Sequence, residues 1–110
     1  MKLFYPNAKL VRVVDGDTLE LLVDVGFRFH AKLKFRLATI DAPEMNTEEG
    51  KAARLFAESW FTSRGWECAV TCHGEDKYGR WIATIHNRKE IGETLNQTLI
   101  DNGHAKKYVG

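Results

Sequence analysis

The chain has 110 residues, of which 44% are hydrophobic, and its formal net charge is +1. This length suits a single domain spanning residues 1–110, and the nearly balanced charge does not by itself indicate a polyanionic partner. No stretch approaches the ~20 consecutive apolar residues of a transmembrane helix, so we expect no membrane association. Residues 1–7 do not form a signal peptide, which predicts a cytoplasmic protein as given, or a secreted one if an upstream segment is missing.

Three strands are predicted in the first part of the chain. Residues 10–14 are apolar enough for a strand, and residues 18–25 alternate apolar and polar side chains. Residues 24–26 are predicted to form the following hairpin bend. The run from residue 27 to residue 37 alternates throughout, which predicts a half-buried strand. Its polar face carries a basic row at intervals of about 6.6 Å, formed by Lys32, Lys34 and Arg36.

The second part of the chain predicts two helices and two more strands. Asn46 and Glu49 are spaced as a capping box that begins a helix, and Gly65 ends it. Its predicted core stripe is Ala52, Leu55, Phe56, Ser59 and Trp60. Strands at residues 66–73 and 81–87 flank a loop, and a short helix follows at residues 94–102. Together these elements predict an α+β, mainly β, five-stranded OB-fold-like barrel with two short helices, whose core holds the tryptophans and most phenylalanines.

The string Cys-x-x-x-Cys-His at residues 68–73 could suggest a metal site, but two small buried residues on a strand are the favoured interpretation. Cys68 and Cys72 would lie about 13 Å apart on one strand, beyond the roughly 7 Å that a disulfide allows. We therefore expect two buried free thiols. The four histidines share no ligand spacing and are predicted to lie at the surface or at strand ends.

Three strings of charged residues point to phosphodiester chemistry. They are VDGDT at residues 14–18, FRLATIDAPE at residues 35–44 and DKYGR at residues 76–80. Their arginines match phosphoryl oxygens, and their carboxylates suit a hard cation. A spare glutamate can orient or deprotonate water. These are the parts that phosphodiester cleavage needs.

The three strings, in this order, resemble the staphylococcal (thermonuclease) nuclease family, and the likeness continues through LNQTLIDNGHAK at residues 95–106. The resemblance implies a Ca²⁺-dependent endo/exonuclease that acts on single-stranded DNA and RNA and on frayed duplex DNA, leaving 3′-phosphate ends. We expect a monomer whose partners are DNA and RNA. The alternative is a non-catalytic nucleic-acid-binding adaptor that keeps the barrel. Degenerate members usually lose the arginines or the carboxylates, and this chain keeps both.

The resemblance also assigns roles to single residues. Asp17, Asp41 and the backbone carbonyl of Ala42 are the implied calcium ligands, and Arg36 and Arg80 are the implied catalytic phosphate clamps. Glu44 is the candidate general base or water-orienting group. Lys77 and Tyr78 are expected to bind the neighbouring phosphate, although loop packing explains Tyr78 equally well. Asp15 is either a turn residue or a support for the metal ligands. Tyr108 is a possible base-stacking residue, to which the resemblance assigns no role.

Overall fold

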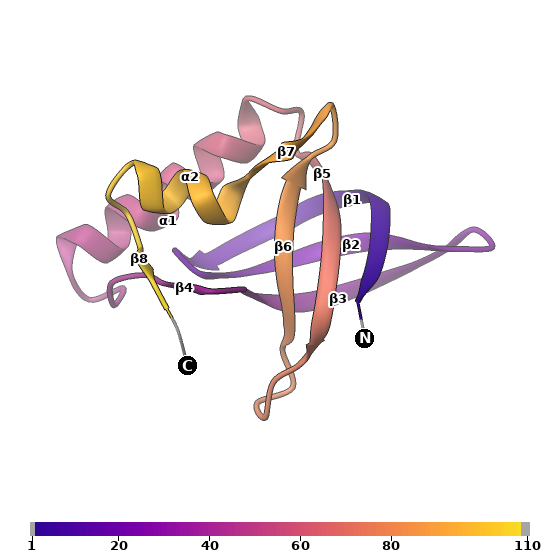
Figure 1. The fold of residues 1–110 in the computed structure, drawn as a ribbon, viewed down its shortest axis with the longest axis horizontal. Helices are drawn as coiled ribbons and strands as arrows, with labels where there is room; N and C mark the ends of the chain where they lie inside the picture. Colours follow the sequence, from indigo (N-terminus) through magenta and orange to yellow (C-terminus); the bar gives the residue numbers. More distant parts are fainter. Residues whose placement is uncertain (1, 109–110) are drawn as a thin grey trace.

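The computed structural model describes residues 2–108, and its central feature is a closed barrel of five strands (Figure 1). These strands are β1 (Leu3–Asp15), β2 (Thr18–Gly26), β3 (Phe29–Leu37), β5 (Glu67–Glu75) and β6 (Trp81–Asn87). Neighbours pair in the order β3-β2-β1-β5-β6, and a parallel pairing of β3 with β6 closes the barrel. The predicted OB-fold-like α+β architecture is therefore confirmed. The predicted strand at residues 10–14 is the second half of the longer β1.

Two helices and three short strands complete the described fold. The helices α1 (Glu48–Thr62) and α2 (Leu95–Asp101) lie together at one end of the barrel (Figure 1). The short strands are β4 (Ile40–Asp41), β7 (Glu90–Thr94) and β8 (Lys106–Lys107). β4 pairs with β8, which brings Lys106 opposite Asp41. No helix within residues 2–108 is both long and apolar enough to cross a membrane.

Helix α1 differs from its prediction in cap and in buried face. The N-cap is Thr47, not Asn46, because the Thr47 hydroxyl accepts the Gly50 N–H at 3.0 Å. The predicted stripe is displaced by one residue at most positions: the buried residues are Gly50, Ala53, Ala57, Trp60 and Phe61. Small residues on this face allow close approach to the chain before the helix. A Cβ on Gly50 would lie 1.9 Å from the Glu44 carbonyl oxygen.

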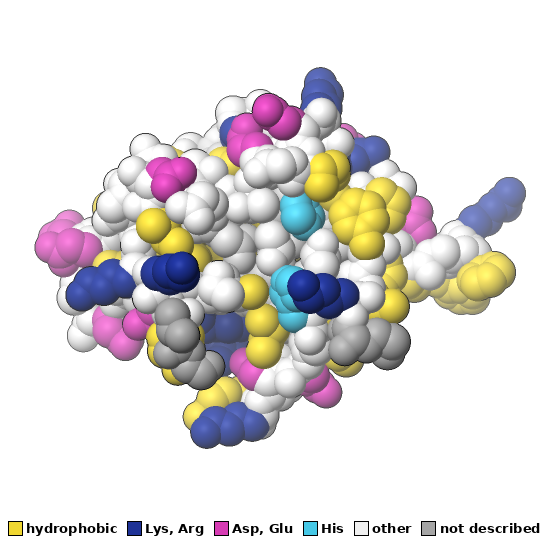
Figure 2. Space-filling model, in the orientation of Figure 1, with side chains coloured by type: hydrophobic (Ala, Val, Ile, Leu, Met, Phe, Trp, Pro, Cys, Tyr) yellow, Lys and Arg dark blue, Asp and Glu magenta, His cyan; other side chains and the backbone are white. Residues whose placement is uncertain are grey.

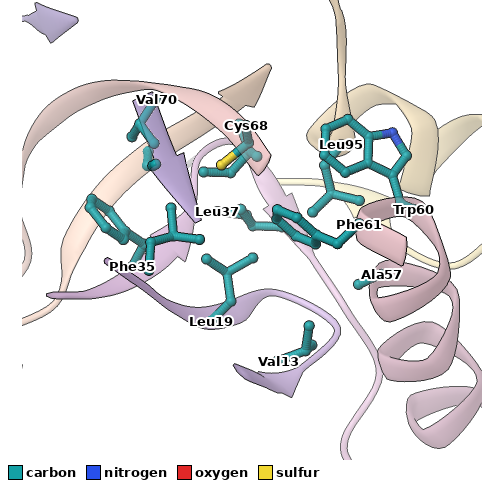
Figure 3. Packing of buried hydrophobic residues seen from close by; sticks show 14 of the residues in the cluster. Val13, Leu19, Phe35, Leu37, Ala57, Trp60, Phe61, Cys68, Val70 and Leu95 are labelled. Carbon is teal, nitrogen blue, oxygen red and sulfur yellow. The ribbon is translucent and has the colours of Figure 1, made fainter. Parts of the chain in front are cut away.

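The core lies between the barrel interior and the two helices. Figure 3 shows Phe61 and Trp60 of α1 facing Leu37, Leu19 and Cys68 of the barrel, with Leu95 of α2 beside them. All of these residues belong to one cluster of buried side chains. Cys68 and Cys72 are buried and free, as predicted. Burial raises the pKa of the Cys68 thiol to about 12, so this thiol stays protonated and inert.

The hairpin of β2 and β3 departs furthest from its prediction. The bend is not at residues 24–26 but at Phe27 and Arg28, which both have positive φ. Phe35 is buried at the barrel end of β3, whereas Phe29 and Phe27 are 70% and 95% exposed. The apolar alternation therefore extends beyond the part of the strand that is actually buried. Phe4 and Trp66 are also exposed, so the assignment of every tryptophan and most phenylalanines to the core is wrong.

Two histidines also depart from their prediction. His73 and His86 lie within β5 and β6 rather than at strand ends, and each is partly buried. Their rings hydrogen-bond to threonines of the neighbouring strand, His73 to Thr84 and His86 to Thr71, both at 2.8 Å. Each pair engages Nε2 of the histidine, and Nδ1 of His86 also lies 2.9 Å from the Ile91 carbonyl oxygen.

Candidate active site

The side chain of Arg36 joins two of the three sequence strings. It projects from the end of β3, with Nη1 3.4 Å from Oδ2 of Asp17 and Nη2 3.4 Å from Oδ1 of Asp41. Nη1 also donates to the Leu37 carbonyl at 3.1 Å. One guanidinium thus holds together the two carboxylates that the sequence predicted as metal ligands.

A tight reversal after β3 returns the chain to Arg36. The Leu37 N–H donates to the Asp17 carbonyl at 2.8 Å, which fixes the end of β3 to the start of β2. Thr39 then adopts a φ of 63°, a conformation that is rare for a β-branched residue. Strain of this kind concentrates at functional sites. The short β4 follows, and its last residue is Asp41.

The turn that carries Asp17 is packed beneath α1. A Cβ on Gly16 would lie 2.7 Å from the Cβ atoms of both Ala42 and Ala53, so only glycine fits there. Asp15 accepts the Asp17 N–H at 3.0 Å. Asp15 therefore shapes the turn that positions Asp17, which is the first of its two predicted roles.

Asp17 is a buried carboxylate with 9% of its surface exposed. Its Oδ2 accepts the Ala42 N–H at 2.9 Å, and its Oδ1 accepts the Thr18 hydroxyl at 3.3 Å. Burial, reinforced by the hydrogen bond with Asp15, raises the pKa of Asp17 to about 6, although the Ala42 N–H and Arg36 act in the opposite direction. Burial therefore disfavours the ionised form of Asp17 by more than the Ala42 N–H and Arg36 favour it.

This donor set fits a hard divalent cation. Asp17 supplies a desolvated carboxylate, and the 61% exposed side chain of Asp41 opens to solvent. Calcium accepts carboxylate and carbonyl oxygens in irregular geometry. Within residues 2–108 no three His, Cys, Asp or Glu side chains cluster as a metal site. Backbone carbonyl, water and substrate oxygens would therefore have to complete the coordination.

The second arginine is fixed by a residue that sequence reasoning missed. Oδ1 of Asp76 accepts the N–H groups of Tyr78 and Arg80, at 2.8 and 3.0 Å. Its Oδ2 accepts Nε of Arg80 at 2.8 Å. Burial raises the pKa of Asp76, but these hydrogen bonds outweigh it and leave the pKa below its usual value. Arg80 is thus held through Nε, which leaves its terminal nitrogens to face a ligand. The signal was the Asp-x-x-Gly-Arg spacing, typical of an Asx-turn.

Both arginines line one cleft of about 970 Å³. Asp41, Lys77 and Tyr78 share this cleft, so the structure brings together five of the predicted site residues. The ring of Tyr78 is 71% exposed but lies under the Lys77 ammonium and the Arg80 guanidinium, 5.3 and 5.4 Å from the ring centroid, so both the phosphate-binding and the loop-packing interpretations stay open. In Figure 2, basic side chains lie over β8 and at the tip of the β5–β6 loop, on either side of the cleft. The cleft is therefore suited to an anionic ligand.

The chain termini also contribute basic and aromatic residues to the cleft. Lys2, Lys107 and Tyr108 contribute to its lining, and the Tyr108 N–H donates to the Thr39 carbonyl at 2.7 Å. A two-residue strand such as β8 has no periodicity to recognise, so its placement could not be predicted.

Glu44 is not placed against the other site residues. Its side chain is exposed and makes no hydrogen bond or ion pair within residues 2–108. Its backbone carbonyl instead accepts the Thr47 N–H and hydroxyl where α1 begins. Its proposed role with water stays a prediction.

The structure is a small OB-fold-like barrel whose cleft is lined by two arginines, with the carboxylates of Asp17 and Asp41 held beside Arg36. Residues 34–109 match the family described as "Staphylococcal nuclease homologue", and the chain belongs to this family. It is similar to "Micrococcal nuclease" of Shigella flexneri, with 32% identity over 109 residues, which are 93% of this chain and 58% of that protein.

Two further relatives have the same coverage of the chain. "Protein ParB" of Escherichia coli is 29% identical over 108 residues, covering 93% of this chain and 57% of that protein. An "Uncharacterized endonuclease" of Escherichia coli O157:H7 is 29% identical over 102 residues, covering 93% of this chain and 61% of that protein. The chain thus spans less than two thirds of the length of these relatives.

Proposed function

We propose that the chain is a calcium-dependent nuclease. Its substrates are single-stranded DNA and RNA and frayed duplex DNA, which it cleaves internally and from ends to leave 3′-phosphates. The observation that carries this proposal is that Arg36, Arg80 and Asp41 converge on one cleft, with Asp17 behind Arg36. The nuclease names of two relatives support it.

Each residue of the cleft has a part in this proposal. Arg36 and Arg80 bind the phosphoryl oxygens, because a planar guanidinium can donate two parallel hydrogen bonds and stabilise the charge that develops on them. Lys77 and Tyr78 bind the adjacent phosphate, and Glu44 orients the attacking water. Asp17, Asp41 and the Ala42 carbonyl would hold calcium, which when bound supplies positive charge that polarises the phosphate.

The first experiment separates the nuclease from the adaptor. A single-stranded DNA 20-mer is incubated with the protein in millimolar calcium, in equal magnesium and in chelator, and the products are resolved on a gel. We expect cleavage with calcium and little with magnesium, because magnesium demands a tight octahedron and keeps its waters. Robust cleavage in chelator would contradict the metal site. Binding of the 20-mer without cleavage under every condition would favour the adaptor.

The second experiment tests the clamps. Arg80→Lys keeps the positive charge but loses the planar fork. We expect turnover to fall about 10²- to 10³-fold, the usual loss for one charge-stabilising donor, with an unchanged circular dichroism spectrum. Lys89→Gln, at the exposed β6–β7 turn, is the matched control and should keep full activity. Full activity of the Arg80 variant would remove the proposed mechanism.

A further inference from the structure

The β2–β3 hairpin continues past the barrel as a free arm, which comprises residues 24–32 (Figure 1). Burial falls steadily toward its tip. Leu19 and Leu21 of β2 are fully buried, whereas Val25 is 40% exposed. Phe29 and Phe27, at and beside the tip, are exposed far more. Figure 2 shows hydrophobic side chains gathered at this end of the molecule, beside a basic one. The arm therefore adds almost nothing to the core.

The tip of the arm carries residues that do not suit its backbone. Phe27 and Arg28 have φ of 55° and 67°, the conformation of a two-residue hairpin turn with both central residues left-handed. Such turns favour Asn-Gly, because side chains with a Cβ are strained there. Neither the turn nor the core benefits from a phenylalanine at this position. Its exposed ring is available to a ligand.

A basic row connects the arm to the cleft. His30, Lys32 and Lys34 are exposed. They precede Arg36 at alternate positions, so they lie on the same face of β3 as Arg36. Glu20, opposite Lys34, is already paired with Arg12, and Asp24, opposite His30, accepts the Gly26 N–H. Within residues 2–108, Arg28 is the one arginine that makes no ion pair. The row spans about 26 Å from Arg36 to the tip, at ~3.3 Å per residue.

We propose that the arm binds the part of a single-stranded nucleic acid that extends beyond the cleft. Lys34 and Lys32 contact successive phosphates, and the ring of Phe27, at the turn beyond the end of the row, stacks on a base. This combination of basic track and aromatic platform is how proteins bind single strands without sequence preference. The proposal rests on the proposed function, since it extends the same substrate. An anionic membrane would also attract a basic, aromatic tip, but the continuity of the row with Arg36 favours the nucleic acid.

The test compares long and short substrates. Fluorescence anisotropy in chelator measures the affinity for a DNA 20-mer, and cleavage in calcium measures kcat/KM for a tetranucleotide that fills only the cleft. Phe27→Ala should weaken 20-mer binding about fivefold to a hundredfold, the range for one lost stacking contact. Tetranucleotide cleavage should be unchanged. The matched control is Phe4→Ala, an exposed phenylalanine on β1 outside the arm.

Two further variants separate charge and folding from stacking. Lys32→Gln and Lys34→Gln should each reduce the salt slope of 20-mer binding by about 0.7, one phosphate contact on a single strand, and Lys51→Gln on α1 should not. Phe27→Asn with Arg28→Gly gives the turn its preferred residues, so Tm should rise while 20-mer affinity falls. A rise in Tm together with a fall in 20-mer affinity cannot result from unfolding of the variant.

Each outcome decides one proposal. Unchanged 20-mer affinity in the arm variants would overturn the arm proposal. So would a loss of binding to phosphatidylglycerol vesicles with 20-mer affinity intact, which would assign the tip to a membrane. If the wild type cleaves nothing but binds the 20-mer through Phe27, the arm stands and the nuclease fails. If it cleaves both substrates and the arm variants match it, the nuclease stands and the arm fails.

Discussion

At the scale of single residues, Asp17 shows a conflict between binding and stability. Its pKa is raised from 3.8 to about 6 by burial, so the folded state favours the neutral acid more than the unfolded state does. The stability that this group contributes is complete below pH about 4 and is lost as the pH rises through about 6. Near pH 7 the folded protein therefore bears the cost of a buried charge, which a bound cation would relieve.

Replacing Asp17 should make the protein more stable and inactive. We expect Asp17→Asn to raise the free energy of unfolding by about 1–3 kcal/mol at pH 7, the order set by a shift of about two pKa units. The gain should shrink at pH 5. Urea unfolding at both pH values in chelator measures this, with Glu90→Gln, an exposed acid, as the control. Equal destabilisation at both pH values would contradict the origin of the raised pKa.

We expect Asp76 to affect activity only by positioning the guanidinium of Arg80. Asp76→Ala removes the acceptor of Nε and of two backbone N–H groups, so the guanidinium loses its fixed orientation. Misplacement of a binding group by about 1 Å costs up to about 10²-fold in rate, and we expect a loss of about 10- to 100-fold in kcat/KM. Glu75→Gln, the exposed neighbouring acid, is the control.

A double variant identifies how Asp76 acts. If Asp76 works through Arg80, adding Asp76→Ala to Arg80→Lys should cost little more activity than Arg80→Lys alone. Additive losses would show that Asp76 acts by another route.

Apart from Glu44, the residues that the charged strings singled out lie close together, because each string combines chemically specific groups. Arg36 meets Asp17 and Asp41, and Arg80 shares their cleft. Asp76 and Tyr108 were given no role from the sequence, although the Asp-x-x-Gly-Arg spacing was a signal for Asp76. The first acts through hydrogen bonds inside a loop, and the second is placed by a β4–β8 pairing that leaves no pattern in the sequence.

At the scale of elements, α2 is fixed to the barrel through one buried amide. Nδ2 of Asn96 donates to the carbonyls of Ala38 and Ala83, at 3.0 and 3.1 Å, and its Oδ1 accepts the Ile85 N–H at 3.0 Å. Ala38 precedes the strained Thr39, and Ala83 lies where β6 pairs with β3. Asn96 therefore ties together α2, the closure of the barrel and the reversal that carries Asp41.

Loss of this amide should destabilise the whole domain. Asn96→Ala leaves three buried backbone groups without that partner, and each unsatisfied group costs about 1–3 kcal/mol. Because the Ala38 N–H to Ala83 carbonyl bond is kept, we expect a total loss of about 2–4 kcal/mol by urea unfolding. Gln97→Ala, whose side chain bonds only to the exposed Asp101, should change stability by less than about 0.5 kcal/mol. Similar stability of the two variants would show that the barrel closes without the amide.

Periodicity predicted the existence of the elements better than their burial. The alternating β3 was recognised from spacing alone, whereas the helix at residues 94–102 was recognised from the family resemblance of residues 95–106. Asn96 looked like an ordinary helix residue, since nothing in the sequence reports that three carbonyl and amide groups converge on it. The same limit applies to Phe27 and Phe29. Alternation indicates which face of a strand is apolar. It does not indicate how much of that face the rest of the barrel covers.

At the scale of the whole molecule, a net charge of +1 conceals an uneven distribution of free positive charge. Apart from Arg28, the arginines within residues 2–108 are paired with carboxylates. Lysines without an ion pair line the cleft, namely Lys2, Lys77 and Lys107. Attraction of a polyanion should therefore follow local position rather than total charge.

The salt dependence of binding should show this. If Arg36, Lys77, Arg80 and Lys107 each contact one phosphate of a 5′-phosphorylated tetranucleotide, the logarithm of affinity should fall with the logarithm of salt concentration with a slope of about −3, from about −0.7 per contact on a single strand. Lys77→Gln and Lys107→Gln should each reduce the magnitude of that slope by about 0.7. Lys89→Gln changes the net charge equally but lies at the β6–β7 turn, outside the cleft, and should leave the slope unchanged. Anisotropy titrations from 50 to 300 mM salt, roughly the range over which phosphate contacts weaken measurably, provide the measurement. Equal effects from all three lysines would mean that the molecule attracts nucleic acid through its total charge and that the cleft does not select the contacts.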